Sequence, residues 1–268
     1  MNGHSLQDAH VVVTGGAAGI GRAIAERAQR DGARGVTVAD LDEAGAQLTA
    51  ESIGGLGVGC DVGDPTEVAR LVATAQERFG PVDVFCSNAG YTDAPGLLTT
   101  RDAATWRHIV DVNLLAHVWA AELVLPGMAQ RGHGGLLQTI SSAALITGPS
   151  GPGYTLSKHG ALGFAEWVAL NYGPLGISVT CLCPNAVWTG MFGRDPSDRS
   201  APPPDVGGLG EVLTPEHVAD VGVDALHGGR FLALPHERVG RSFARKGSDY
   251  DGWIEHTSQR LAKLTGSA

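Results

Sequence analysis

A tyrosine and a lysine four residues apart, Tyr154 and Lys158, are the residues whose types and spacing best suit proton transfer. In a helix, this spacing places both side chains on one face. A phenol has an ordinary pKa of about 10, and a nearby ammonium group stabilises its ionised form. At ~4 Å and an effective dielectric constant of ~20, the attraction is about 4 kcal/mol, or about 3 pKa units, which reaches the working range of a general acid or base.

A surface helix can carry such a pair without any function, so the pair is interpreted together with a glycine-rich segment upstream. Residues 10–26 contain a β-branched run, the glycines Gly15, Gly19 and Gly21, and then an alanine-rich helical pattern. Glycines let a backbone approach a pyrophosphate closely, and the free N–H groups of a helix start attract that anion. The first turn is one residue longer than in the general fingerprint. We predict a dinucleotide site here, with a plain structural loop as the alternative.

Asp40 ends the second predicted strand, 19 residues after the last glycine of this turn. A carboxylate at this distance accepts hydrogen bonds from ribose hydroxyls and repels a 2′-phosphate. Ala18 in the glycine turn and Leu41 after Asp40 offer no cation to such a phosphate. Arg22 is the competing cation, and we expect it to face solvent. The pattern therefore favours NAD over NADP.

Four separated motifs make the chain resemble the short-chain dehydrogenase/reductase family from about residue 8 to residue 190. They are Thr14-Gly-Gly-Ala-Ala-Gly-Ile-Gly21, Asn88-Ala-Gly90, Asn113, and Ser142 with Tyr154 and Lys158. The resemblance implies that Tyr154 exchanges a proton with the substrate oxygen while a nicotinamide exchanges a hydride with its carbon. It further implies that Lys158 lowers the pKa of the tyrosine and binds the nicotinamide ribose. Ser142 would hydrogen-bond the substrate oxygen, and Asn113 would hold a proton-relaying water.

Two adjacent serines compete for the substrate role. Aligning Ile140-Ser-Ser-Ala-Ala144 on the strand end of the family selects Ser142, whereas the commonest interval to the tyrosine selects Ser141. We assign Ser142, because the sheet fixes the strand end while the loop at 148–153 can absorb a deletion of one residue.

The resemblance also implies cofactor contacts at the ends of the other strands. Asp61 would reach the adenine amino group, and Thr189 would reach the nicotinamide amide. Asn185 stands where the family usually has glycine. The predicted cofactor-binding residues are Gly15, Gly19, Ile20, Gly21, Asp40, Leu41, Asp61, Val62, Asn88, Ala89, Gly90, Tyr154, Lys158, Pro184, Val187 and Thr189.

Hydrophobic runs alternate with helical patterns along the whole chain, which predicts an α/β fold. The expected architecture is a doubly wound parallel sheet (Rossmann fold) in three α/β/α layers, forming a single domain over 1–268. Ligands of such sheets lie beyond the carboxyl ends of the strands at the switch point, where this order places the residues above. The predicted strands are 10–14, 35–40, 56–60, 82–86, 135–140, 176–182 and 230–234. The predicted helices are 19–31, 42–52, 64–79, 102–125, 153–172 and 214–227.

Composition argues against several other classes of protein. A formal charge of −9 disfavours a nucleic-acid partner. We see no run of ~18 apolar residues for a membrane span and no secretory signal, so we expect a soluble cytoplasmic protein. We also expect no metal and interpret the cysteines as buried thiols, Cys60, Cys86, Cys181 and Cys183. The basic cluster Arg238, Arg241, Arg245 and Lys246 is interpreted as a solvated helix or tail.

The substrate is least defined by the sequence. A Gly- and Pro-rich segment, 188–213, is either a lid or a disordered loop, and the segment 236–268 is an atypical C-terminal tail. Apolar residues suggest an apolar alcohol or ketone, although they also suit core or lid packing: Tyr91, Leu97, Leu145, Trp188, Met191 and Phe192. The resemblance implies a dimer or tetramer formed through the helix at 102–125 and the helix that carries Tyr154. Small and apolar side chains there fit such packing or an ordinary core: Ala161, Phe164 and Leu170.

These observations predict an NAD-dependent short-chain alcohol dehydrogenase or carbonyl reductase with Tyr154 as the general acid/base. Two alternatives remain. One is a regulatory protein that binds NAD(H) without turnover. The other is an epimerase that uses transient oxidation, which the resemblance disfavours because such members carry an extra C-terminal substrate domain.

Overall fold

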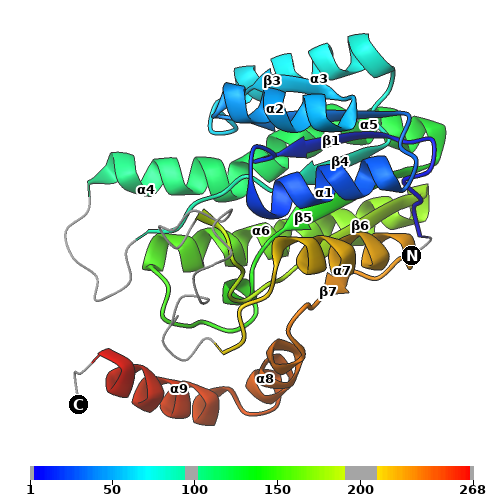
Figure 1. Cartoon of the computed structure of the whole chain (residues 1–268). Coiled ribbons are helices and arrows are strands. Elements are labelled where there is room, and N and C mark those ends of the chain that lie inside the picture. The colour runs from blue at the N-terminus through cyan, green and yellow to red at the C-terminus, as the bar shows by residue number, and fades with distance from the viewer. Residues whose placement is uncertain (1–2, 94–101, 191–209, 266–268) are drawn as a thin grey trace.

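The computed structural model describes residues 3–93, 102–190 and 210–265 of the 268-residue chain. In this part of the chain, seven parallel strands form one sheet in the order β3-β2-β1-β4-β5-β6-β7, with helices on both faces (Figure 1). The strands are β1 (His10–Thr14), β2 (Gly35–Asp40), β3 (Leu56–Gly59), β4 (Val84–Ser87), β5 (Gly134–Thr139), β6 (Ile177–Leu182) and β7 (Leu232–Ala233). The helices that cover the sheet are α1 (Gly19–Arg30), α2 (Glu43–Ile53), α3 (Pro65–Phe79), α4 (Ala103–Val110), α5 (Ala116–Arg131), α6 (Pro152–Tyr172) and α7 (Pro215–His227). This is the doubly wound, three-layer α/β fold predicted from the sequence.

Both faces of the sheet are buried, which explains why its central strands are continuous apolar runs. On β1, Val12 packs into one cluster with Leu71 of α3 and other residues from α5 and α6. Its neighbour Val13 points to the opposite face and packs with Ile24 of α1 and Val223 of α7. The strand order reverses between β1 and β4, so the carboxyl ends of these two strands diverge into the crevice where ligands of such folds bind.

Local signals set where the helices begin. The side chain of Asp64 accepts a hydrogen bond from the Thr66 N–H, and Pro65 is the first residue of α3. Thr214 and Pro215 start α7 in the same way. A capping side chain satisfies an N–H group that the helix leaves open, and proline suits the first position because its missing N–H is not needed there. The predicted helix starts are therefore within one residue of those observed.

The helix predicted over 102–125 is longer than expected and is interrupted. α4 and α5 are joined by a π-helical segment, Asp111–Leu115, and α5 continues through Pro126 to Arg131. The sequence prediction stopped at the proline, but Val124 and Met128 on either side of it are both buried in the core. Packing of an apolar face contributes most of the stability of a helix within a protein, and here it outweighs the local cost of the proline.

The same stretch bears on the membrane prediction. Among the described residues, Ala103–Arg131 is long and apolar enough by length and composition to cross a bilayer, with a mean hydropathy of 1.4. Half of its most apolar window is buried inside the fold, as in core helices that pass the same test. The statement that no segment reaches this length and composition is thus wrong, and the lack of a membrane partner remains a prediction.

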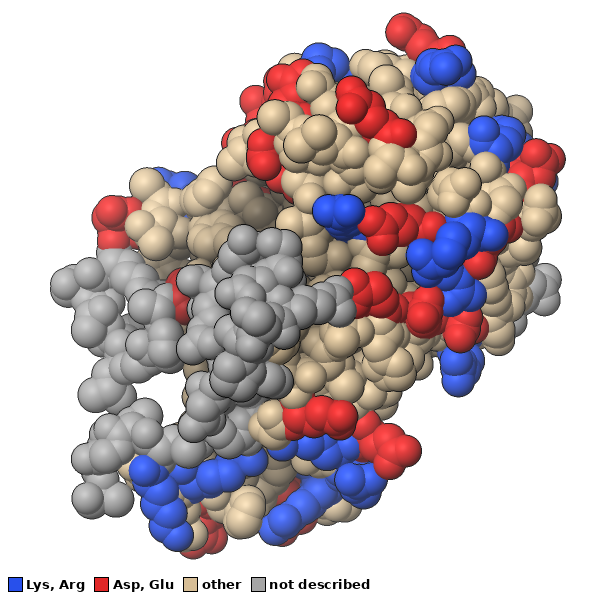
Figure 2. All heavy atoms as spheres, in the orientation of Figure 1, with Lys and Arg blue, Asp and Glu red and all other residues tan. Residues whose placement is uncertain are grey.

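The segment interpreted as an atypical tail contains two helices, α8 (Glu237–Ser248) and α9 (Tyr250–Thr265). They follow β7 and lie beneath the carboxyl ends of the strands (Figure 1). In the space-filling view, Lys and Arg side chains gather over this end of the molecule, whereas both signs of charge are mixed over the sheet and its helices (Figure 2).

Candidate active site

The glycine turn between β1 and α1 has the conformation that only glycine adopts readily. Gly15 and Gly19 have φ angles of 65° and 56°. A Cβ atom on Gly15 would lie 2.8 Å from the Ala89 Cα atom, and one on Gly21 would collide with the Gly15 carbonyl. No side chain caps the start of α1, so its first N–H groups are available to an anion. We call this turn, Gly15 to Gly21, the glycine cradle, because a side chain at Gly15 or Gly21 would fill the space beside its backbone.

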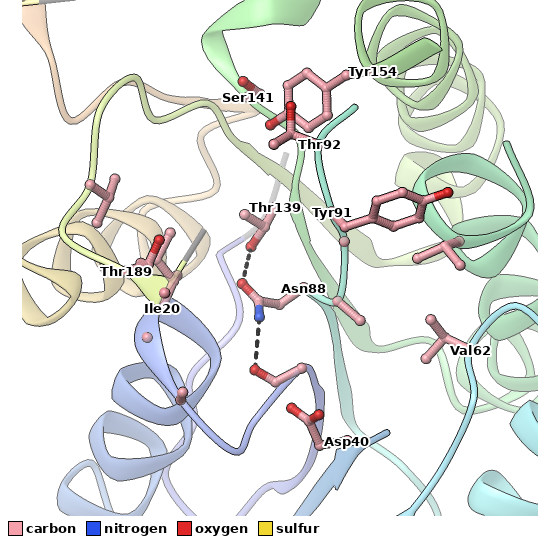
Figure 3. Close-up of a pocket in the computed structure, with 18 of the residues that line it drawn as sticks. Ile20, Asp40, Val62, Asn88, Tyr91, Thr92, Thr139, Ser141, Tyr154 and Thr189 are labelled. Carbon is pink, nitrogen blue, oxygen red and sulfur yellow. Dashed lines mark hydrogen bonds between the residues drawn. The ribbon is translucent and has the colours of Figure 1, made fainter. Parts of the chain in front are cut away.

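Asp40 is fixed at the end of β2 by two backbone groups. Its carboxylate accepts hydrogen bonds from the N–H of Ala17 at 3.0 Å and from the N–H of Asp42 at 3.0 Å. These bonds hold the side chain between the glycine turn and the start of α2, at the lower end of the pocket in Figure 3. Arg22 pairs with Glu26 at 2.8 Å on the exposed side of α1, as expected from the sequence.

A cleft of about 580 Å³ runs along these strand ends. All of the predicted cofactor residues except Gly21 line it. Gly21 is buried and packs against the carbonyl of Gly15 from below, so its role lies in the packing of α1 against the turn. The cleft has the volume of ordinary small-molecule sites.

Asn88 holds three strands together at the centre of the cleft. Its amide nitrogen donates to the carbonyls of Thr14 and Gly15 at 3.1 and 3.3 Å, and its oxygen accepts from the Thr139 hydroxyl at 2.9 Å (Figure 3). The Thr14 hydroxyl in turn accepts from the N–H groups of Asn88 and Ala89 at 3.0 and 3.2 Å. Asn88 therefore fixes the glycine turn against β4 and β5.

Tyr154 and Lys158 lie on the same side of α6, as their spacing predicted. The Lys158 ammonium is 5.8 Å from the centroid of the Tyr154 ring and donates to the Thr139 carbonyl at 3.0 Å. The start of α6 is fixed by Asp93, whose carboxylate accepts from the N–H groups of Gly153 and Tyr154, both at 3.0 Å. The sequence analysis missed Asp93, because it caps a helix that begins almost sixty residues later in the chain.

Burial dominates the electrostatics of this pair. It raises the pKa of the Tyr154 phenol above its ordinary value, and a hydrogen bond with the Ser141 side chain acts in the opposite direction. Burial also lowers the pKa of Lys158 to about 8. The pKa of Tyr154 is thus raised in this structure, and its lowering by the Lys158 ammonium stays a prediction.

The two adjacent serines have different partners. The Ser141 side chain hydrogen-bonds the Tyr154 phenol, and the two lie side by side in Figure 3. The Ser142 hydroxyl instead donates to the Asn185 side-chain oxygen at 3.2 Å. The geometry therefore favours Ser141, which the interval to the tyrosine also selects, over the predicted Ser142. Ser141 has an unusual backbone conformation at the end of β5, with φ 148° and ψ 156°.

Asn113 is fully buried within the π-helical segment. Its amide donates to the Tyr91 carbonyl at 2.8 Å and accepts from the Tyr91 N–H at 3.0 Å. Both ends of the side chain thus hold the segment that follows β4. A π-helical turn leaves the regular bonding pattern of a helix and is frequent at functional sites.

Residues expected around the substrate are only partly brought together. Tyr91 lines the cleft, whereas Leu145 is buried in the core. Leu97, Met191 and Phe192 lie outside the described residues, as does most of the predicted lid. The ends of the lid segment are joined, because Val187 pairs with Leu213 and the Trp188 N–H donates to the Leu213 carbonyl at 2.9 Å.

Comparison with known proteins identifies the family. A family model described as short chain dehydrogenase matches residues 9–200. The chain belongs to the short-chain dehydrogenase family. A 1-deoxy-11-beta-hydroxypentalenate dehydrogenase from Streptomyces exfoliatus is 35% identical over 84% of this chain and 82% of its own. A 3beta-hydroxysteroid dehydrogenase from Mediterraneibacter gnavus is 34% identical over 70% of this chain and 69% of its own.

Solved structures of short-chain dehydrogenases share the fold. One from Burkholderia phymatum in complex with NAD has a TM-score of 0.81 and 25% identity, covering 92% of this chain and 96% of its own. A 3-ketoacyl-(acyl-carrier-protein) reductase from Brucella melitensis complexed with NADH has a TM-score of 0.76 and 25% identity, covering 86% and 96%. The relatives are dehydrogenases and reductases, which supports an oxidoreductase activity for this member of the family.

A second cavity adjoins the cofactor cleft, and part of its wall comes from residues beyond the range matched by the short-chain dehydrogenase model. Its volume is about 590 Å³, and Ser141 and Tyr154 line both this cavity and the cofactor cleft. Residues of α8 and α9 form part of its wall. The basic cluster interpreted as a solvated tail is therefore divided. Lys246 is buried, and Arg238 is half-buried and lines the cavity. Arg245 is exposed to solvent at the cavity wall, and Arg241 is exposed and pairs with Glu237 at 3.4 Å outside it.

Proposed function

We propose that this oxidoreductase interconverts a secondary alcohol and a ketone with NAD, and that Tyr154 is the general acid/base. The observation that carries the proposal is the position of the Tyr154 phenol with Ser141, at the junction of the cofactor cleft and the second cavity. A proton donor at this junction can reach a substrate in one cavity while its reacting carbon faces the other. General acid/base groups must lie within hydrogen-bonding reach of the proton they move.

The residues of the cleft fit a nicotinamide dinucleotide. The glycine cradle and the uncapped start of α1 suit its pyrophosphate, and the Asp40 carboxylate suits the ribose hydroxyls. Two solved relatives contain NAD or NADH, which supports a nicotinamide cofactor for this chain. The carboxylate would repel a 2′-phosphate, and this charge is our reason for proposing NAD rather than NADP.

When bound, the nicotinamide supplies or accepts the hydride. In the direction of ketone reduction, the Tyr154 hydroxyl gives its proton to the carbonyl oxygen, and in alcohol oxidation the phenolate takes the hydroxyl proton. Ser141 orients the same oxygen by a hydrogen bond and stabilises the phenolate. Lys158 provides a positive charge next to the ring and is held in place by the Thr139 carbonyl.

We also propose that the protein forms a homo-oligomer through the outer faces of α5 and α6. Large apolar side chains are exposed there, including Trp167 at 52% and Leu170 at 77%. Exposed apolar side chains that lie close together are typical of interaction sites. Ala161, expected at the same interface, is fully buried in the core instead.

The test is a panel of secondary alcohols and ketones, assayed with NAD and with NADP by nicotinamide absorbance. We expect turnover with NAD, and we expect Asp40→Ser to reduce the preference for NAD roughly ten- to hundredfold, because a hydrogen bond to a charged group contributes about 1.5–3 kcal/mol. Asp42→Asn is the matched control, since Asp42 caps α2 and does not line the cleft. Equal use of NADP by the unmodified protein contradicts the cofactor proposal. NAD binding without turnover of any substrate favours the regulatory alternative.

A further inference from the structure

The second cavity joins the reacting groups to a wall that the family model does not cover. Ser141 and Tyr154 line it on one side, and side chains of α8 and α9 line it on the other. A substrate that presents its oxygen to Tyr154 therefore extends towards these two C-terminal helices. The composition of that wall decides what the far end of the substrate can be.

Each of the two helices presents one face to the cavity. On α8 the lining residues are Arg238, Ser242 and Arg245, which follow one another at intervals of four and three residues. On α9, Trp253, Thr257 and Arg260 repeat the same intervals, and His256 lines the cavity beside them. Such intervals place side chains in a row along a helix. The rows that face the cavity thus end in arginines, and the guanidinium-bearing residues Arg245 and Arg260 are exposed at its wall.

The charge of this lining is opposite to that of the chain. Among the described residues, Arg238, Arg245 and Arg260 line the cavity together with a single carboxylate, that of Asp93, in a chain with a formal charge of −9. The Asp93 carboxylate is occupied by the two N–H groups at the start of α6. Figure 2 shows that Lys and Arg gather at this end of the molecule.

Two of these arginines have no carboxylate partner in the described part of the chain. No ion pair within 4.0 Å is found for Arg245 or Arg260. Around the sheet, by contrast, Arg27 pairs with Asp31 at 2.8 Å and Arg34 pairs with Asp83 at 2.6 Å. Guanidinium groups match carboxylate and phosphate geometry with paired hydrogen bonds.

The wall is anchored next to the reacting groups. Lys246 of α8 is buried, and its ammonium donates to the Leu145 carbonyl at 2.9 Å. The same ammonium lies 5.1 Å from the ring centroid of Trp253, which joins α8 to α9. The Leu145 N–H bonds to the Ser142 carbonyl at 3.0 Å, one residue from Ser141. These contacts fix the two helices that carry Arg245 and Arg260 next to the segment that holds Ser141.

We propose that the substrate carries an anionic group, a carboxylate or a phosphate, remote from the reacting oxygen, and that Arg245 and Arg260 bind it. The apolar side chains Ile146, Pro149 and Trp253 line the same cavity and suit an apolar body between the two ends. The apolar substrate expected from the sequence thus becomes an apolar alcohol or ketone with a charged end. This inference rests on the proposed function, because it assigns the substrate class of the same site.

The test compares cyclic and linear hydroxy acids with their amides and with hydroxyalkyl phosphates of the same carbon skeleton, using the full chain and NAD. We expect kcat/KM to be at least tenfold higher for the anionic members, mainly through KM. The double variant Arg245→Gln/Arg260→Gln should lose this factor and keep its activity on the amides. Carboxylates and phosphates are compared at equal concentration, and the preferred series identifies the anion.

Arg241→Gln is the matched control, since Arg241 lies on α8 and pairs with Glu237 outside the cavity. Equal kcat/KM for acids and amides in the unmodified protein overturns the inference. So does an equal loss on both series in the double variant, or the same loss in Arg241→Gln.

A binding experiment distinguishes failure of the proposed reaction from failure of the anion site. If no alcohol is oxidised, binding of cyclohexanecarboxylate is measured by calorimetry in the presence of NAD. Binding that the double variant loses and Arg241→Gln keeps supports the anion site while contradicting the proposed reaction. Absence of binding to the unmodified protein overturns the anion site as well.

Discussion

Ser141 is predicted to be needed for turnover although its backbone is strained in the native fold. Its hydroxyl hydrogen-bonds the Tyr154 phenol and accepts from the Ala143 N–H at 3.1 Å. Its φ of 148° and ψ of 156° lie in a region that is essentially reserved for glycine. Three variants separate these properties: Ser141→Ala, Ser141→Gly and Ser142→Ala.

Ser141→Ala and Ser141→Gly should lose the same amount of activity but differ in their free energy of unfolding. Loss of a positioned hydrogen-bond donor to a reacting oxygen costs about 3 kcal/mol, or roughly a hundred- to thousandfold in kcat, in both Ser141 variants. Removing the cap of the Ala143 N–H costs about 1 kcal/mol of unfolding free energy in Ser141→Ala. Glycine releases about 1–3 kcal/mol of strain and loses about 0.5–1 kcal/mol to chain entropy. Ser141→Gly should therefore be about 1 kcal/mol more stable than Ser141→Ala.

The assays are kcat on the best alcohol with NAD and unfolding in urea. In the unmodified protein the hydrogen bond from Ser141 lowers the pKa of Tyr154. Both Ser141 variants lose this bond, so the pH profile of kcat for alcohol oxidation should shift to higher pH. Ser142→Ala removes a hydroxyl that bonds Asn185 and should change kcat by less than about threefold. A large loss in Ser142→Ala with little loss in Ser141→Ala would refute the reassignment. A Ser141→Gly variant less stable than Ser141→Ala would refute the argument from strain.

Three further predictions concern the cradle, the ion pair of a buried carboxylate and the C-terminal helices. Gly15→Ala should weaken NAD binding at least roughly tenfold in a fluorescence titration, because its φ is 65° and its Cβ would lie 2.8 Å from the neighbouring backbone; unchanged affinity would contradict the cradle. Burial disfavours ionised Asp83, but a backbone hydrogen bond and the ion pair with Arg34 outweigh it and lower its pKa. Asp83→Asn should thus cost about 1–3 kcal/mol of unfolding free energy near neutral pH. The difference in unfolding free energy between the two proteins should shrink as the pH falls below about 3.9, the pKa of an unfolded aspartate, and vanish below the pKa of folded Asp83. A difference that does not change with pH would show that Asp83 is not ionised in the folded protein. Lys246→Met should speed amide hydrogen exchange in α8 and α9 but not in the sheet, because it removes the bond to the Leu145 carbonyl. Lys263→Met, at an exposed site on α9, is the control and should leave exchange in both helices unchanged. The same increase in exchange in both variants would exclude Lys246 as the anchor of the two helices.

The sheet could be predicted from the sequence because its strands are buried on both faces. Val11, Val12 and Val13 are each 0% exposed, so β1 reads as an unbroken apolar run and its bounds are confirmed. Strand ends then place Asp40 and Asn88 at one edge of the sheet, and this placement follows from topology alone.

The sequence could not predict features that depend on distant contacts, nor the choice between two adjacent residues of the same type. The choice between Ser141 and Ser142 depends on an unusual φ angle at the end of β5, which no residue type signals. Helices α8 and α9 were not predicted from the sequence because charged residues occupy the faces that line the cavity, and Arg245 there is indeed exposed to solvent. The interval between Arg238 and Arg245 was the available signal.

The central claim is that Tyr154 moves the proton at a site where NAD is bound. The most direct test is turnover of the best alcohol by Tyr154→Phe, with NAD affinity measured on the same sample. Removing a general acid/base lowers the rate by a factor of about 10² to 10⁴. We predict a loss of this size with NAD affinity within about threefold of the unmodified protein, because the ring remains and only its hydroxyl is removed. Turnover retained in Tyr154→Phe would contradict the account.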